Sequence, residues 1–187
     1  MSKSRLEAFS DGVLAIIITI MVLEMSAPTD ASFSSLLEVV PTFIGYVVSY
    51  TYIGIYWVNH HRLLVRTDHV CGRALWANLL WMFFVSLIPF ATAWASNTGF
   101  APAPVFFYSL VILLSAFGYQ VLDMTIRHAQ GTMDNLFTVI FKTRKNLLTV
   151  IGYALCLALS FIFVPATYVL YILIAILWIM PDVEQSN

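Results

Sequence analysis

The chain has 187 residues, of which 60% are apolar and only 10% are charged, and its formal net charge is −1. With a mean hydropathy of +0.87, this composition excludes a soluble globular domain and is typical of a helical membrane protein with several spans. Because one span needs about 20 apolar residues, the length fits about six spans in a single domain of residues 1–187. The apolar runs are continuous rather than alternating, which argues against a β-barrel.

The apolar runs predict six membrane-spanning helices in chain order. The first run, 5–25, ends before a short loop that contains the helix breaker Pro28. The second run, 33–64, is longer than a simple span, and we expect it either to kink or to start as an interfacial segment around Glu38 and Pro41. The last two runs meet at Pro165 in a turn too short for a re-entrant loop. The other four expected spans are 74–96, 104–127, 143–163 and 165–181.

The basic residues indicate how these spans are oriented. Six spans place both termini, the second loop and the fourth loop on one side of the membrane, whereas five or seven spans would mix the sides. By the positive-inside rule, the side that carries the Lys and Arg residues is cytoplasmic, which predicts a multi-pass plasma-membrane protein with both termini inside. Asp123 and Arg127, four residues apart, are expected to pair on their own helix. The nine basic residues, all on the predicted inner side, are Lys3, Arg5, Arg62, Arg66, Arg73, Arg127, Lys142, Arg144 and Lys145.

A polar motif opens the first span, where Arg5 is followed by Phe9, Ser10 and Asp11. Ser10 or Asp11 could simply cap the helix, with Arg5 at the lipid headgroups. Alternatively, Asp11 lies just inside the membrane boundary, where a carboxylate without a partner is costly, and accepts hydrogen bonds from other helices. The topology places the candidate donors at the same depth, and they are Trp57, His60 and His61 on the second span and Asn78 on the third.

The adjacent histidines, His60 and His61, raise the question of a metal or haem site. The two other histidines, His69 and His128, lie in predicted loops, and no HxxxH or Cys/His spacing occurs. Hydrogen bonding to the first helix is therefore the favoured role of the pair. We expect no cofactor and no structural metal.

One face of the first helix carries Ile16, Thr19, Ile20 and Leu23, at helical positions i, i+3, i+4 and i+7. In isolation such a stripe is typical of a lipid-facing or packed surface. No span contains the TVGYG run of a carbonyl filter or the spaced arginines of a voltage sensor. Glu24 follows the stripe and could either attract cations at an outer pore mouth or lie among the headgroups.

Taken together, three features resemble the prokaryotic members of the transmembrane protein 175 family, relatives of the endosomal and lysosomal potassium channel. They are the RxxxFSD signature from Arg5 to Asp11, the pair His60 and His61 after Trp57, and Pro181-Asp182 after the sixth span. The animal channels carry two six-helix repeats. The resemblance therefore implies that this one-repeat chain assembles as a homotetramer around a central axis.

The resemblance also implies a potassium-permeable channel whose pore is lined by the first helix. Counted from the signature aspartate, the hydrophobic constriction layers fall on Ile16, on Thr19 or Ile20, and on Leu23. Permeating potassium would pass close to these side chains, with the hydroxyls of Thr19 replacing part of its hydration shell. The expected partners are potassium and other monovalent cations, the lipid bilayer and three further copies of the chain, without nucleic acid.

Two other functions stay open at this point. A proton-coupled secondary transporter, or a proton-conducting channel, could use Asp11 and the histidines of the second span as a relay. A transporter is expected to show inverted repeats and a helix broken at mid-membrane, and no repeat is evident in the sequence. Because the spans offer no cluster of titratable groups, an enzyme is disfavoured.

Overall fold

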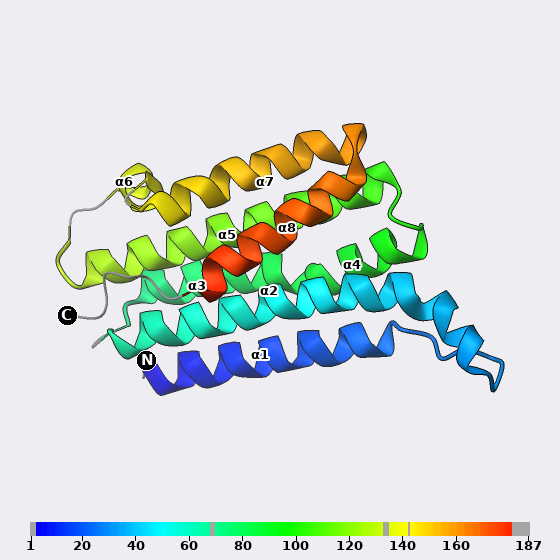
Figure 1. Ribbon diagram of the computed structural model, residues 1–187. Helices are drawn as coiled ribbons and strands as arrows, with labels where there is room; N and C mark the ends of the chain where they lie inside the picture. The colour runs from blue at the N-terminus through cyan, green and yellow to red at the C-terminus, as the bar shows by residue number, and fades with distance from the viewer. Residues whose placement is uncertain (1–2, 68–69, 133–134, 142, 181–187) are drawn as a thin grey trace.

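The computed structural model describes residues 3–67, 70–132, 135–141 and 143–180, and within these ranges the predicted all-helical class is confirmed (Figure 1). The motif Pro181-Asp182 and the end of the expected 165–181 span lie outside the described residues. In chain order the helices are α1 (Lys3–Leu23), the 3-10 helix η1 (Phe33–Val39), α2 (Val40–Val65), α3 (Gly72–Ser86), α4 (Ile88–Asn97), α5 (Pro102–Ala129), α6 (Leu136–Phe141), α7 (Arg144–Ile162) and α8 (Val164–Ile179).

Among the described residues, five helical segments are long and apolar enough to cross a membrane. The apolar helix α8 is shorter, with 16 residues, which corresponds to a rise of about 24 Å against a hydrocarbon core of about 30 Å. The five segments are Lys3–Leu23, Phe33–Val65, Gly72–Asn97, Pro102–Ala129 and Arg144–Ile162.

Prolines set the positions at which the long segments change direction. Pro41 lies in the first turn of α2, directly after η1. Pro89 divides the third segment into α3 and α4 at Leu87, because proline has no N–H to donate to the carbonyl one turn earlier. The expected single helix over 74–96 is therefore two helices in tandem. Pro165 lies in the first turn of α8, which begins directly after α7.

The long helices alternate in direction, so the start of α1 lies at the same end of the bundle as the ends of α2 and α5 and the start of α7 (Figure 1). Helix α5 packs mainly against α3, α4 and α7, whereas α1 packs against α2, α3 and α4 at the edge of the bundle. Gly118 permits the close approach of α5 to α3, because a Cβ atom at this position would lie 3.0 Å from the Cα of Trp81. One side of α1 is therefore packed and the other is bare.

Buried hydroxyl groups link the helices inside the bundle, as is common where lipid leaves helices no hydrophobic drive to associate. The Ser49 hydroxyl on α2 lies 2.7 Å from Oγ1 of Thr92 on α4 and 3.0 Å from the Tyr108 hydroxyl on α5. The Ser109 hydroxyl on α5 lies 2.6 Å from that of Tyr171 on α8. These contacts join four helices into one packed unit against which α1 rests.

Candidate pore helix and its polar anchor

Three buried polar side chains connect the start of α1 to α2 and α3. Asn78 Nδ2 donates to the Ser10 hydroxyl over 3.0 Å, and Asn78 Oδ1 lies 3.0 Å from Nε2 of His60. Ser10 in turn donates to the carbonyl of Leu6 on its own helix, over 2.9 Å. Since the Asn78 amide nitrogen faces Ser10, its oxygen accepts, and His60 Nε2 carries the proton of this bond. None of the three side chains is more than 1% exposed, so each polar atom depends on these bonds.

Asp11 bonds to α2 at a different residue from the buried histidine. Trp57 Nε1 donates to Asp11 Oδ1 over 3.0 Å, while one turn earlier on α1 the Glu7 carboxylate lies 3.3 Å from Nδ1 of His61. The Trp57 and His61 rings stack with centroids 6.2 Å apart. Of the four predicted donors, Trp57 alone hydrogen-bonds to Asp11. His60 bonds to Asn78, which in turn donates to Ser10.

Glu7 is the member of this contact that the sequence reasoning missed. A signal for it was present, because Glu7 and Asp11 are four residues apart on α1, as are Trp57 and His61 on α2. On antiparallel helices, two such pairs meet in register. The acidic pair and the aromatic pair therefore form one seam between α1 and α2.

Arg5 and Phe9 of the signature lie outside this seam. Both are exposed, and both line a shallow cleft of about 350 Å³ between α1 and α3, beside Leu75 and Trp76. The structure thus divides the RxxxFSD motif into a buried anchor, Ser10, a seam contact, Asp11, and two exposed side chains.

The stripe on α1 is bare in the isolated subunit. Leu23 is 82% exposed and Ile16 is 59% exposed, whereas Ile17, on the packed side of the helix, is 3% exposed. The Thr19 hydroxyl donates to the carbonyl of Ile16 over 2.8 Å, which leaves its oxygen lone pairs free to face a cation. Ile20 is 40% exposed, and all four side chains of the stripe are classed as exposed.

A groove runs along part of this face, between α1 and α4. It has a volume of about 390 Å³ and is lined by Ile16, Ile20 and Glu24 on one side and by Pro89 and Phe90 on the other. Glu24 is exposed directly after the last residue of α1. Leu23, the last residue of α1, does not line this groove.

Metal-ligating side chains do not gather in the part of the chain that the structure describes. There, no group of three or more His, Cys, Asp or Glu side chains is placed to hold a metal ion, and Cys71 and Cys156 are free thiols. His69 lies outside the described residues.

Comparison with known proteins identifies the family. The family model described as the endosomal/lysosomal potassium channel TMEM175 matches residues 5–89, the stretch from Arg5 to Pro89 that contains both the anchor and the bare face. A potassium channel of Chryseobacterium sp. (strain P1-3) is 43% identical over 188 residues, and the match covers 100% of this chain and 98% of that one. The chain belongs to the TMEM175 family.

The resemblance drawn from the signature is therefore confirmed, and TMEM175 relatives extend it to the fold. The crystal structure of a lysosomal potassium-selective channel TMEM175 homolog from Chamaesiphon minutus superposes with a TM-score of 0.79. It is 28% identical, and the match covers 95% of this chain and 96% of that chain. The human endosomal/lysosomal proton channel TMEM175 is 32% identical over 116 residues, which is 56% of this chain and 23% of the longer human protein.

Proposed function

We propose that this chain is one subunit of a homotetrameric potassium-permeable channel in the plasma membrane, with α1 from each subunit lining the central pore. The observation that carries the proposal is the bare stripe of α1, opposite a side that is anchored by buried hydrogen bonds. The similarity to proteins named potassium channels supports potassium as the permeating ion. Six spans, with α8 as the sixth, and cytoplasmic termini agree with the basic residues at one end of the bundle.

The packing inside a single subunit supports the tetramer. Among the described residues, its interior is filled mainly by apolar side chains, and most of the buried hydroxyls are hydrogen-bonded within the bundle. A ring of four copies encloses a passage on its symmetry axis, lined by the face that each subunit leaves uncovered.

The passage would be constricted by side chains rather than by backbone carbonyls. Ile16, Ile20 and Leu23 are one helical turn apart, so each would form a ring of four apolar side chains that blocks ions by size or by dewetting. Between them, four Thr19 hydroxyls would face the ion. Glu24 would place a ring of carboxylates just beyond the last layer, where they raise the local cation concentration.

In this proposal the polar anchor is structural. Ser10 and Asn78 fix α1 to α3, and Asp11 and Trp57 fix it to α2, so that the bare stripe points away from the subunit. Breaking either contact would strand a polar group at the membrane boundary. Asp11 accordingly stabilises the position of the pore helix and takes no part in binding the ion.

Planar-bilayer recording of the purified protein under a potassium/sodium gradient tests this function. We expect an ohmic current whose reversal potential is shifted towards that of potassium, and a larger current for Leu23→Ala. Leu155→Ala is the matched control, because it makes the same change at an exposed leucine far from the proposed pore. Leu155 lies on α7, which packs mainly against α5 and α8 rather than against α1. An unchanged current in Leu23→Ala would remove this residue from the constriction, and no current in either protein would refute the channel.

A proton-conducting channel is the second candidate, because the human relative carries that name and because Glu7, Asp11 and His61 gather on one seam. In the same bilayers, a pH gradient with an impermeant organic cation in place of potassium distinguishes the two. A reversal potential that follows the proton gradient would favour proton conduction.

A coupled transporter also stays a candidate, because the break between α3 and α4 at Leu87 is the kind of helix interruption that transporters use. Its readout is uptake into liposomes against a substrate gradient when a proton gradient is imposed. Such uptake without an ohmic current would replace the channel by the transporter.

A further inference from the structure

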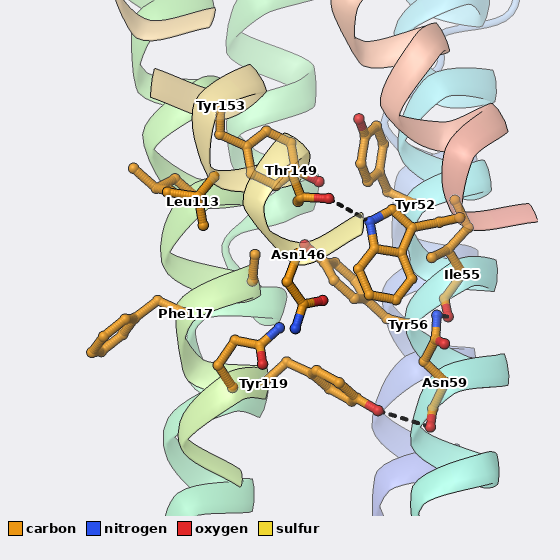
Figure 2. Close-up of a pocket in the computed structure, with 14 residues that line it drawn as sticks. Tyr52, Ile55, Tyr56, Asn59, Leu113, Phe117, Tyr119, Asn146, Thr149 and Tyr153 are labelled. Atoms are coloured by element: carbon orange, nitrogen blue, oxygen red, sulfur yellow. Dashed lines mark hydrogen bonds between the residues drawn. The ribbon is translucent and has the colours of Figure 1, made fainter. Parts of the chain in front are cut away.

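Two adjoining cavities lie between α2, α5, α7 and α8, on the far side of the bundle from the stripe of α1. One is about 150 Å³ and is lined mainly by apolar and aromatic side chains (Figure 2). The other is about 260 Å³ and lies at the end of the bundle that carries the basic residues. The two cavities form one crevice, because they share the lining residues Asn59, Tyr119, Gln120, Asn146 and Trp178.

The apolar cavity is suited to hydrocarbon. Several polar groups in its wall are already paired: the Tyr119 hydroxyl donates to the carbonyl of Asn59 over 2.9 Å, and Trp178 Nε1 donates to the Thr149 hydroxyl over 2.8 Å (Figure 2). Phe117 is 41% exposed at the rim and points away from the other labelled side chains (Figure 2). An apolar cavity of this kind stays dry and accepts apolar groups. Its other walls include Tyr52, Tyr56, Leu113 and Tyr153.

The basic cavity has an excess of positive charge. Four cations and one carboxylate line it, which gives a net charge of +3. Arg127 Nε donates to both carboxylate oxygens of Asp123, over 2.9 and 3.0 Å, and this pairing confirms the one expected from their spacing. The carboxylate is therefore committed to Arg127. Arg62 and Arg66 remain to attract an anion, and Lys145 adds to the positive charge of the cavity.

The two arginines of α2 are not balanced by a carboxylate among the described residues. In the described ranges neither Arg62 nor Arg66 makes a side-chain hydrogen bond or an ion pair with another residue. They are four residues apart on one helix face, where like charges repel. An anion bound between them would remove this repulsion.

Further groups at the junction of the cavities favour an anion. Thr143, the N-cap of α7, lines the basic cavity, so the positive end of this helix dipole faces the same space. Lys145 Nζ donates to the carbonyl of Met180 over 3.1 Å and lies 5.0 Å from the centroid of the Trp178 ring, which holds its charge at the junction. The half-buried Gln120 amide has no hydrogen-bond partner among the described residues.

We propose that this crevice binds one anionic phospholipid from the leaflet at the basic end of the bundle. The phosphate lies against Arg62, Arg66 and Lys145, and an acyl chain enters the apolar cavity. Basic pockets between transmembrane helices bind anionic lipid headgroups in this manner. A zwitterionic lipid would bring its own cation against the arginines, and a free phosphate would leave the apolar cavity unused. The inference rests on the membrane placement proposed above but is independent of the pore.

Native mass spectrometry of the purified protein, titrated with dioleoyl phosphatidylglycerol or dioleoyl phosphatidylcholine, tests the charge. We expect the wild type to retain phosphatidylglycerol preferentially. Each arginine near an anionic headgroup contributes about fivefold to the binding affinity. The double variant Arg62→Ala/Arg66→Ala should therefore bind phosphatidylglycerol about 25-fold more weakly. Arg73→Ala is the matched control, because Arg73 is exposed at the same end of the bundle but lines neither cavity. An equal loss in Arg73→Ala, or no preference in the wild type, would overturn the proposal.

The acyl-chain half of the site needs its own variant, which also separates a lipid from a free anion. Ala116→Leu fills the apolar cavity without changing a charge, and Ala154→Leu makes the same change on the exposed face of α7. We expect phosphatidylglycerol retention to fall at least fivefold in Ala116→Leu and to stay unchanged in Ala154→Leu, with no displacement by millimolar inorganic phosphate. If Ala116→Leu does not fold, Val150→Phe fills the cavity from its α7 wall. Full retention in the filled cavity together with displacement by phosphate would show an anion site and refute the lipid.

The same preparations are recorded in bilayers, so the two proposals fail separately. Normal current without lipid preference refutes the lipid site alone, whereas lipid preference without current refutes the pore alone.

Discussion

Replacing Asn78 by alanine is the most direct way to test whether the buried anchor fixes α1. The variant deletes two hydrogen bonds of 3.0 Å, one to Ser10 and one to His60. Ser10 keeps its bond to the Leu6 carbonyl, but the described contacts leave His60 Nε2 without an acceptor inside the bundle. The cost therefore includes a stranded buried donor as well as the two lost bonds.

The magnitude follows from these two terms. Side-chain hydrogen bonds between membrane helices contribute about 0.6 kcal/mol on average and at most about 1.7 kcal/mol. A buried polar group left without its partner costs about 1–3 kcal/mol. We therefore expect Asn78→Ala to lower the free energy of unfolding by about 2–4 kcal/mol. Ser10→Ala loses one bond but leaves the buried Asn78 Nδ2 donor without its acceptor, so it should cost about 2–3 kcal/mol. Because the two residues share one bond, the double variant should show a coupling of about 0.6–1.7 kcal/mol.

The assay is reversible unfolding of the purified protein in mixed micelles, with helix content followed by circular dichroism as sodium dodecyl sulfate is added. Thr125→Ala is the control, because among the described residues the Thr125 hydroxyl bonds only to the carbonyl of Val121 on its own helix. If Asn78→Ala and Thr125→Ala unfold at the same detergent fraction, the anchor does not hold α1. Additive effects of Asn78→Ala and Ser10→Ala would show that these two residues do not interact.

Three further changes probe the seam, the pore and the packing. Asp11→Ala should reduce the yield of tetramer, measured by size-exclusion chromatography with light scattering, and leave the reversal potential of the remaining channels unchanged. Normal assembly of this variant would contradict the structural role of Asp11. Thr19→Val keeps the side-chain shape but loses the hydroxyl, so the reversal potential under a potassium/sodium gradient should move towards zero, and an unaltered value would exclude Thr19 from selectivity. Gly118→Ala places a Cβ 3.0 Å from the Cα of Trp81 and should lower the free energy of unfolding by about 1–3 kcal/mol, measured as a lower unfolding midpoint. Gly54→Ala is the control and should not lower the midpoint, because its added Cβ meets nothing within 4 Å.

The sequence by itself determined the membrane class, the helical architecture and the family. These depend on local quantities: the length of apolar runs, the positions of proline and the order of residues in the RxxxFSD signature. The periodicity of α1 likewise placed Ile16, Thr19, Ile20 and Leu23 on one face, because a helix of 3.6 residues per turn fixes which side chains are neighbours. Depth in the membrane also predicted that Asp11, the polar residues at the end of the second span and Asn78 lie at one level, although it did not predict Glu7.

Only the tertiary structure decided which of those residues meet. Partner choice at one depth depends on how each helix is rotated about its axis, and packing against the rest of the bundle sets that rotation. Trp57 therefore reaches Asp11, His61 reaches Glu7, and His60 turns inward to Asn78. The same packing leaves the stripe of α1 bare.

The crevice was beyond the sequence for the same physical reason. Its basic and apolar walls come from α2, α5, α7 and α8, which are far apart in the chain and adjacent only in the fold. In the sequence, Arg62 and Arg66 look like ordinary positive-inside residues. Only the folded chain places them beside a cavity, where neither side chain bonds to another described residue. A single helix has no interior, so cavities and unmatched charges arise only where several helices pack together.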